Sequence, residues 1–398
     1  MPPSNEEHTG TRIARYRKQR GLLQQGLALR ANVSKSLLSK VECGQKPASP
    51  AFVAACARAL SVSTSDLLGQ PYADELRRDR MDELIQPLRA GLENWDIPLD
   101  WETAPRPVTL LRGEVKRALA QRRQAEYTEM ARTLPGLMDE SVHTVHTTSG
   151  EEQRQAYTCL AGIFQCTFTL AWQLGCTDLA TVALDRLAWT APRTDEPGWS
   201  ALYAVLRAQT TLAYGRYDVG MRVVDGALRD LEGQAARRPA GIEAMRGMLH
   251  LRAAVIAGRA KDRDHADARL AQARALAQET GELPDYGVTW GPTNVGVHAV
   301  AIASELDEFD HAVALAQEVH IPPGWTRSRA GHHWMDLARA HTWTDRPAEA
   351  LECLHRARKA APQQTRYHPM ARDTVLTLKR RERRPSGSLA QYAEWMGL

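Results

Sequence analysis

Four polar side chains within one short segment have the types and the spacing to hydrogen-bond with the bases of a nucleic acid. They are Lys35, Ser36, Ser39 and Lys40. Leu38 and Val41 recur among them at helical spacing, so a helix would turn these two inward and the polar side chains outward. Hydroxyl and ammonium groups reach base edges in the major groove, lysines also neutralise phosphates, and Leu37 could touch a thymine methyl group. The segment therefore predicts a helix that reads the major groove of double-stranded DNA.

The wider segment from Gln24 to Gly44, QQGLALRANVSKSLLSKVECG, has the pattern of two short helices joined by a tight turn. Its apolar residues fall at helical spacing and can pack the two helices together: Leu27, Ala28, Val33, Leu38 and Val41. Gln24 begins the first helix, where its amide can donate to a phosphate and brace the second helix. We expect structural roles for Glu42 and Gly44, the glycine because it permits a left-handed helix end.

Residues 12–69 resemble the Cro/repressor-type helix-turn-helix domain of the XRE family. The pattern RGLxQxxLAxRAxVSxSxLSxxExG runs from Arg20 to Gly44, and the segment from Ala48 to Leu68 follows in its family place. One position departs from the family, because Leu23 stands where Ser or Thr usually caps the first helix of the motif; a missing cap costs about 1 kcal/mol. The resemblance implies a five-helix, lambda-repressor-like fold and a homodimer that binds a near-palindromic DNA operator.

Basic residues are concentrated around this motif. Residues 1–70 carry ten Lys and Arg against four Asp and Glu, a net charge of +6, whereas the whole chain has +4. This asymmetry assigns a polyanionic partner to the N-terminal segment. Arg12 and Arg15 on the predicted first helix, and Lys46 in the loop after the motif, are candidate phosphate contacts; the alternative is that they only solvate a charged face.

The remaining composition favours a cytoplasmic protein without a cofactor, a metal or a membrane span. No apolar run approaches the roughly 20 residues that cross a bilayer, and the N-terminus lacks a signal-peptide core. The six cysteines form no C-x-x-C pair. His143 and His146 have no third metal ligand at a convincing spacing, and no phosphate-binding, hydrolase or metalloprotease motif is present. We therefore do not expect an enzyme.

The chain divides by composition into five parts. Residues 1–10 are predicted to be a disordered arm, 11–70 the helix-turn-helix domain and 71–107 a helical elbow. The elbow could either dimerise two chains or pack within one chain. Residues 108–383 read as helical throughout, and 384–398 as a C-terminal capping helix. The basic run 378–385 could be a solvated helix end or a further nucleic-acid contact.

Small residues and turns repeat along the helical part. Five units are offset by roughly 40 residues and share small residues at equivalent positions: Ala180, Gly220, Ala266, Ala312 and Ala350. The pattern resembles tetratricopeptide repeats, stretched beyond their usual length of about 34 residues. Stacked repeats of this kind form an α-solenoid with a concave surface. An irregular helical bundle is the alternative.

The tetratricopeptide resemblance implies that the first helix of each repeat lines the concave surface. Carried over to this chain, it gives ligand candidates Gln165, Thr169, Trp172, Gln209, Asn294, His332 and Arg339. Trp290 joins them because it lies in the turn-rich segment YGVTWGPTN, a composition typical of pocket rims. Such a surface suits a signalling peptide or a small metabolite. The order of a helix-turn-helix domain followed by helical repeats resembles ligand-sensing transcriptional regulators of high-GC bacteria. The alternative is a DNA-tethered scaffold that recruits a partner protein. Whether such a regulator represses or activates transcription stays open.

Overall fold

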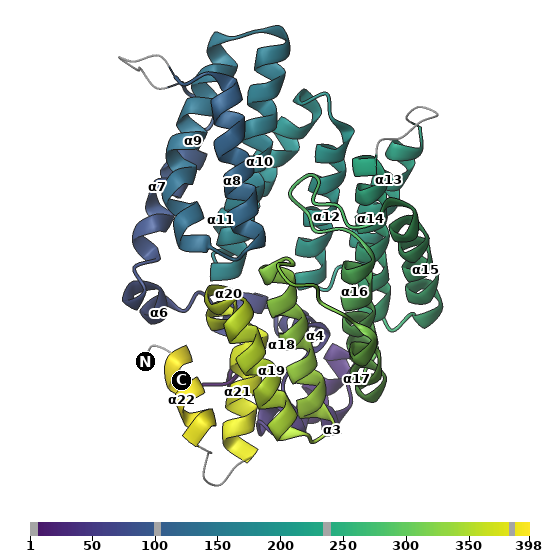
Figure 1. The fold of residues 1–398 in the computed structure, drawn as a ribbon. Helices are drawn as coiled ribbons and strands as arrows, with labels where there is room; N and C mark the ends of the chain where they lie inside the picture. Colours follow the sequence, from purple (N-terminus) through teal and green to yellow (C-terminus); the bar gives the residue numbers. More distant parts are fainter. Residues whose placement is uncertain (1–6, 99–104, 234–239, 382–386) are drawn as a thin grey trace.

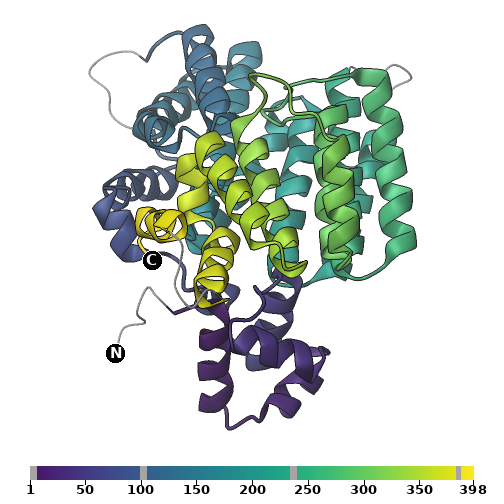
Figure 2. The ribbon, with the colours of Figure 1, turned by 60° about the horizontal axis from the view of Figure 1, so that its bottom comes forward.

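The computed structural model describes residues 7–98, 105–233, 240–381 and 387–398. Within these ranges the regular structure is helical, and the single β-type pairing is an isolated bridge between Leu283 and Trp290. The all-α prediction is confirmed. A small N-terminal head is attached to a larger helical body (Figure 1), and Figure 2 shows the head projecting from one side of that body.

The head consists of α1 (Thr9–Gln19), α2 (Gln24–Ala31), α3 (Lys35–Glu42), α4 (Pro50–Leu60) and α5 (Thr64–Leu68). The apolar residues predicted from helical spacing form its core: Leu27, Ala28, Leu38 and Val41 are buried, and Val33 is half-buried. Asn32 ends α2 at φ 53°, a left-handed conformation that asparagine tolerates, and this makes the tight turn into α3. As expected, Leu23 at the start of α2 makes no capping hydrogen bond.

The structure differs from the predicted disordered arm at its end. Helix α1 begins at Thr9, two residues earlier than expected, and the His8 side chain caps it by accepting a hydrogen bond from the Thr11 amide. Thr9 is buried against Asp373 of the body, and Gly10 is buried against Val41 of α3. Residues 1–6 lie outside the described residues.

The elbow packs within the chain. It forms α6 (Ala73–Arg78) and α7 (Asp82–Glu93), and Leu76, Ile85, Leu88 and Leu92 are buried in the main apolar core of the body. Of the two open alternatives for this segment, intrachain packing is therefore the one found. Residues 99–104 of the elbow lie outside the described residues.

The body is a succession of antiparallel helix pairs. After α8 (Val108–Arg123) and α9 (Tyr127–Thr147), the five predicted units appear as five pairs, with the short η1 (Ala191–Arg193) after the first of them. The pairs are α10 (Gly150–Leu174) with α11 (Thr177–Thr190), α12 (Pro197–Ala213) with α13 (Tyr217–Glu232), α14 (Ala240–Arg259) with α15 (Arg263–Thr280), α16 (Pro292–Glu305) with α17 (Phe309–Glu318), and α18 (Arg327–Trp343) with α19 (Pro347–Ala360).

The small residues that revealed the repeats lie where helices cross. Ala180, Ala266, Ala312 and Ala350 have no exposed surface, because each packs against the other helix of its pair or against the next pair. A Cβ atom on Gly220 would lie 2.5 Å from the Thr211 hydroxyl on the partner helix. The close helix crossing therefore requires these small side chains.

Helices α20 (Pro362–Tyr367), α21 (Pro369–Arg381) and α22 (Gly387–Met396) complete the body. The predicted capping helix is α22, which buries Leu389, Tyr392 and Met396 against the last repeat. Helix α20 reaches the beginning of the body, where the Gln363 side chain accepts hydrogen bonds from the Tyr127 and Thr128 amides of α9. Helix α18 also packs against α8, so the last repeat touches the first helices of the body (Figure 1).

Candidate nucleic-acid interface and the inner surface of the body

Helix α3 presents a polar face that the rest of the head leaves open. The Ser34 side chain caps the helix by accepting a hydrogen bond from the Leu37 amide at 3.1 Å, while Leu38 and Val41 anchor the inner face in the core. The predicted base-reading residues lie on the other side: Lys35, Ser36 and Lys40 are exposed, and Leu37 and Ser39 are half-buried. The arrangement matches the geometry that a groove-reading helix requires.

Glu42 holds the helices of the motif together. Its two carboxylate oxygens accept hydrogen bonds from Arg17 Nε at 2.7 Å and Nη2 at 2.9 Å, a bidentate pair in which both side chains are nearly buried. Gln24 Nε2 donates to the same carboxylate at 2.8 Å. Gln24 therefore braces α3 as predicted, and Glu42 has the structural role expected for it.

The predicted phosphate contacts Arg12 and Arg15 on α1 lie in different surroundings. Arg12 is buried, and its guanidinium donates to the carbonyl oxygens of Glu7, Leu67 and Leu68, so it ties α1 to the end of α5 instead of facing a phosphate. The prediction for Arg12 is wrong in this conformation. Arg15 is 36% exposed and pairs with Glu7, a contact that solvent can reach.

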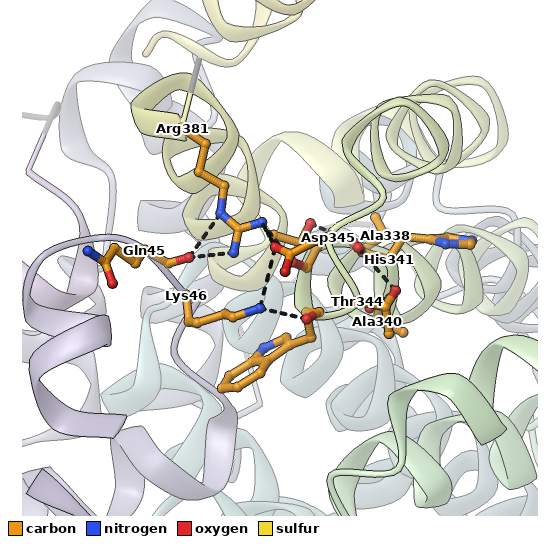
Figure 3. A network of polar contacts seen from close by, with 10 residues as sticks. Gln45, Lys46, Ala338, Ala340, His341, Thr344, Asp345 and Arg381 are labelled. Atoms are coloured by element: carbon orange, nitrogen blue, oxygen red, sulfur yellow. Dashed lines mark hydrogen bonds and ion pairs between the residues drawn. The ribbon is translucent and has the colours of Figure 1, made fainter. Parts of the chain in front are cut away.

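Lys46 contacts the body. Its ammonium donates to the Trp343 carbonyl at 2.5 Å and lies 3.7 Å from a carboxylate oxygen of Asp345, and its side chain is only 15% exposed. Arg381 completes the network by donating to the Gln45 carbonyl at 2.6 Å and to Asp345 at 2.8 Å (Figure 3). The loop after the candidate recognition helix is therefore held by α18 and α21, and Lys46 does not point to solvent as a phosphate contact would.

Asp373 on α21 makes the most buried link between head and body. Its carboxylate accepts hydrogen bonds from the Thr9 amide at 3.2 Å and from the Ala48 amide at 2.8 Å. Burial raises the pKa of Asp373, although both amide hydrogen bonds favour its charged form. A cavity of about 20 Å³, space for one water molecule, lies beside it. A third contact joins Arg58 on α4 to the Gly215 carbonyl at 3.1 Å.

The eight predicted ligand residues do not lie together in one site. Gln165 and Thr169 on α10 lie near Arg122, and Gln165 donates to the Tyr286 carbonyl at 3.2 Å. Trp172 stacks on Phe168 of its own helix. Trp290 has no exposed surface and donates to the Thr280 hydroxyl, so the prediction that it lines a pocket rim is wrong.

A second group brings together residues of α12, α14, α16 and α18. Arg329 Nε donates to the Asn294 side-chain oxygen at 3.0 Å. Gln209 accepts a 3.4 Å hydrogen bond from Arg252. His332 lies 3.7 Å from the Asp336 carboxylate, and the fully buried Arg339 lies one helical turn further along α18. Four predicted residues thus belong to one polar cluster between these helices, which we call the inner cluster: Gln209, Asn294, His332 and Arg339, with Arg252, Arg259, His298, Glu305, Arg329 and Asp336.

Sequence reasoning missed Arg252, Arg329 and Asp373. Each reads as an ordinary charged residue of a helix, and only the packing of distant helices buries it. One signal was available for Arg329, because Arg329, His332, Asp336 and Arg339 recur at intervals of three and four residues, which places them on one face of α18.

A groove lies on the opposite face of α16 from Asn294. It has a volume of about 370 Å³ and is bounded by α15, α16 and α17, with Arg274, Thr293 and His320 among its lining residues. None of the eight predicted ligand residues lines it. In the described part of the chain, no three His, Cys, Asp or Glu side chains gather as a metal site would require, and no helix is long and apolar enough to span a bilayer.

Comparison with known proteins identifies the head. Residues 8–68 match the family model described as a helix-turn-helix domain, which covers α1 to α5. The chain thus carries a helix-turn-helix DNA-binding domain in front of an all-helical body with repeat-like packing. No curated protein and no solved structure matches the chain.

Proposed function

We propose that this protein is a cytoplasmic, ligand-responsive transcriptional regulator without enzymatic activity. In this proposal Lys35, Ser36, Ser39 and Lys40 read base edges, and Leu37 packs on a thymine methyl group. Gln24 and Arg15 contact phosphates beside the groove. The open polar face of α3 and the family match of the head support this assignment.

We further propose that two copies bind a near-palindromic operator as a homodimer. Helix α3 has eight residues, so one head can read only a few base pairs. Two heads in successive major grooves supply the affinity and specificity that one lacks.

The observation that carries the regulatory part of the proposal is the position of α18. Arg329, His332 and Arg339 of this helix belong to the inner cluster, and Trp343 at its end accepts the hydrogen bond from Lys46 of the head. A ligand that binds at Arg329 and moves α18 would therefore alter the contact with the head. Trp343 lies about 21 Å from Arg329 along the helix, since a helix rises 1.5 Å per residue. Regulation requires that the ligand bind the two head positions with different affinity.

The alternative of a scaffold that recruits a partner protein has less support. Protein recruitment by a repeat groove favours an exposed apolar strip, whereas the inner cluster consists of guanidinium, imidazole, amide and carboxylate groups that are largely shielded from solvent. This composition favours a small polar ligand.

Footprinting of purified protein across its own promoter, with and without extract of the source culture, tests the proposal. We expect protection of a site with two-fold symmetry and a change of protection with extract. The variant K35A/K40A should lose the footprint, while Arg222→Ala, which removes an exposed cation of the body, should retain it. An unchanged footprint for K35A/K40A would refute the assignment of α3.

A further inference from the structure

Arg252 on α14 carries a charge that the protein does not neutralise. Its Nη2 makes a long hydrogen bond of 3.4 Å to Gln209, and its Nε has no partner among the described residues. The charged groups close enough to affect it are Arg329 and Arg259, both cations. Burial, together with these two cations, lowers the pKa of Arg252 to about 9. A desolvated guanidinium without a counter-ion is strongly unfavourable, so its retention needs an explanation.

The neighbouring arginines share too few carboxylates. Glu305 Oε1 lies 3.5 Å from Arg259 Nε and 3.6 Å from Arg339 Nη2, so one carboxylate serves two guanidiniums. All three guanidinium nitrogens of the fully buried Arg339 lack a hydrogen-bond partner among the described residues. Burial alone would raise the pKa of Glu305, but Arg259 and Arg339 outweigh it and lower that pKa. The Glu305 carboxylate is therefore already committed and cannot neutralise Arg252.

The other groups of the inner cluster do not neutralise Arg252. Asp336 is the second carboxylate; burial raises its pKa, and its charge acts on Arg329, whereas no carboxylate is among the charged groups that affect Arg252. Burial lowers the pKa of His332 to about 3 and that of His298 well below its ordinary value, so both rings are neutral. His298 Nδ1 donates to the Asn294 carbonyl at 2.8 Å, which leaves Nε2 to accept from Arg329 Nη2 at 3.4 Å. Four arginines thus face at most two carboxylates.

Arg252 and Arg329 remain accessible within this cluster. Both are half-buried rather than buried, although burial lowers the pKa of Arg329 to about 10. Neither Nη1 atom makes a hydrogen bond among the described residues, so both have donors open to an incoming group.

We propose that the inner cluster is an oxyanion-binding site in which the Arg252 and Arg329 guanidiniums hold a carboxylate or phosphate of the regulatory ligand. The planar fork of a guanidinium matches both anions, and two forks fix the orientation of the bound group. Arg259 and Arg339 strengthen the positive field around it. The inference deepens the proposed sensing function, because it names the ligand as an anion and places its charged group beside α18.

Thermal unfolding of the full-length protein tests the site with simple anions. Inorganic phosphate and citrate, titrated against sodium chloride at equal ionic strength, should raise the melting temperature by about 3 °C at a hundredfold excess over Kd for a chain of 398 residues. A short peptide with a free C-terminal carboxylate, compared with its amidated form, separates a peptide ligand from a free metabolite. Stabilisation by the free form alone identifies the peptide carboxylate as a source of the anion.

Arg252→Gln distinguishes a binding residue from a structural one. It should abolish the anion response and leave the melting temperature without ligand unchanged or higher, because it removes an uncompensated charge. Arg329→Lys should keep the positive charge but reduce the stabilisation by anions, because an ammonium group cannot make the paired hydrogen bonds of a planar guanidinium. Arg222→Gln, an exposed arginine paired with Asp218, is the matched control and should respond like the wild type.

Two results would overturn the inference: no anion stabilises the wild type beyond chloride, or Arg252→Gln responds as strongly as the wild type. The same variants in a DNA-binding assay keep the two proposals separate. Anion stabilisation that depends on Arg252 without any change in DNA affinity supports the oxyanion site and refutes ligand-responsive regulation. DNA binding without a specific anion effect refutes the oxyanion site alone.

Discussion

Replacing Asp373 by alanine should release the head from the body. The substitution removes the acceptor of two buried amides, those of Thr9 and Ala48, and an unsatisfied buried donor costs about 1–3 kcal/mol. The contact is thus weakened by about 2–6 kcal/mol. Because the water-sized cavity beside Asp373 can admit a solvating water, we expect a value near the lower limit, which corresponds to a factor of about thirty in the population of the released state.

Asp345→Ala is the matched control at the same interface. Asp345 pairs with Lys46 and Arg381, but its side chain is 76% exposed, and exposed ion pairs contribute at most about 1 kcal/mol. Comparing D373A with D345A therefore separates the effect of losing a buried hydrogen-bond acceptor from the effect of losing a negative charge. We expect D345A to behave nearly as the wild type.

Amide hydrogen exchange of Ala48 measures the release directly. In D373A its exchange should accelerate by at least the factor of thirty, while amides in the core of α10 keep their wild-type rates. Binding to a non-specific duplex gives a second measurement, since a freed Lys46 adds one phosphate contact and steepens the logarithmic salt dependence by about 0.9. Unchanged exchange at Ala48 in D373A, or an equal acceleration in D345A, would refute the reasoning.

Three further predictions concern the head and the buried histidines. Lys35→Ala and Lys40→Ala should each weaken duplex binding by about 1–3 kcal/mol and relax its sequence preference, measured by fluorescence anisotropy; unchanged affinity and preference in both variants would contradict contacts with base edges. Glu42→Ala leaves Arg17 buried without its partner and should destabilise the head by about 3–5 kcal/mol in calorimetric unfolding, whereas an unchanged transition would show that Glu42 does not organise the motif. Burial lowers the pKa of both His8 and His333 to about 4, so the unfolded chain binds more protons between that value and 6.5, and stability is lost as the pH falls through this window. Each histidine should contribute about 1.4 kcal/mol of this loss by pH 5.5 in urea unfolding, and His333→Gln should flatten the pH dependence; an equally steep profile would contradict it.

The head was predictable because its determinants are local. The Ser34 cap, the turn at Asn32 and the spacing of Leu27, Leu38 and Val41 act within a few residues of chain. The repeats were predictable for a similar reason, since an alanine or glycine at a helix crossing leaves a periodic trace such as Ala266 and Ala312.

The inner cluster and the head–body contacts were only partly predictable. Helix α14 buries residues on nearly all sides, so its sequence does not indicate which way Arg252 points. Asp373 contacts Thr9 across a separation of 364 residues, and no local pattern encodes such a pairing. Trp290 was misassigned because a turn-rich segment can fold inward when its aromatic ring finds an apolar cluster and a hydroxyl partner.

The contact of α20 with α9 and of α18 with α8 gives this chain a property that open repeat arrays lack. An array with free ends can gain or lose a unit, because each unit touches only its neighbours. Here the first and last units meet, so duplication or deletion of one helix pair would break the seam between them. We therefore expect natural variants of this architecture to keep a constant number of units and to vary in loop length instead.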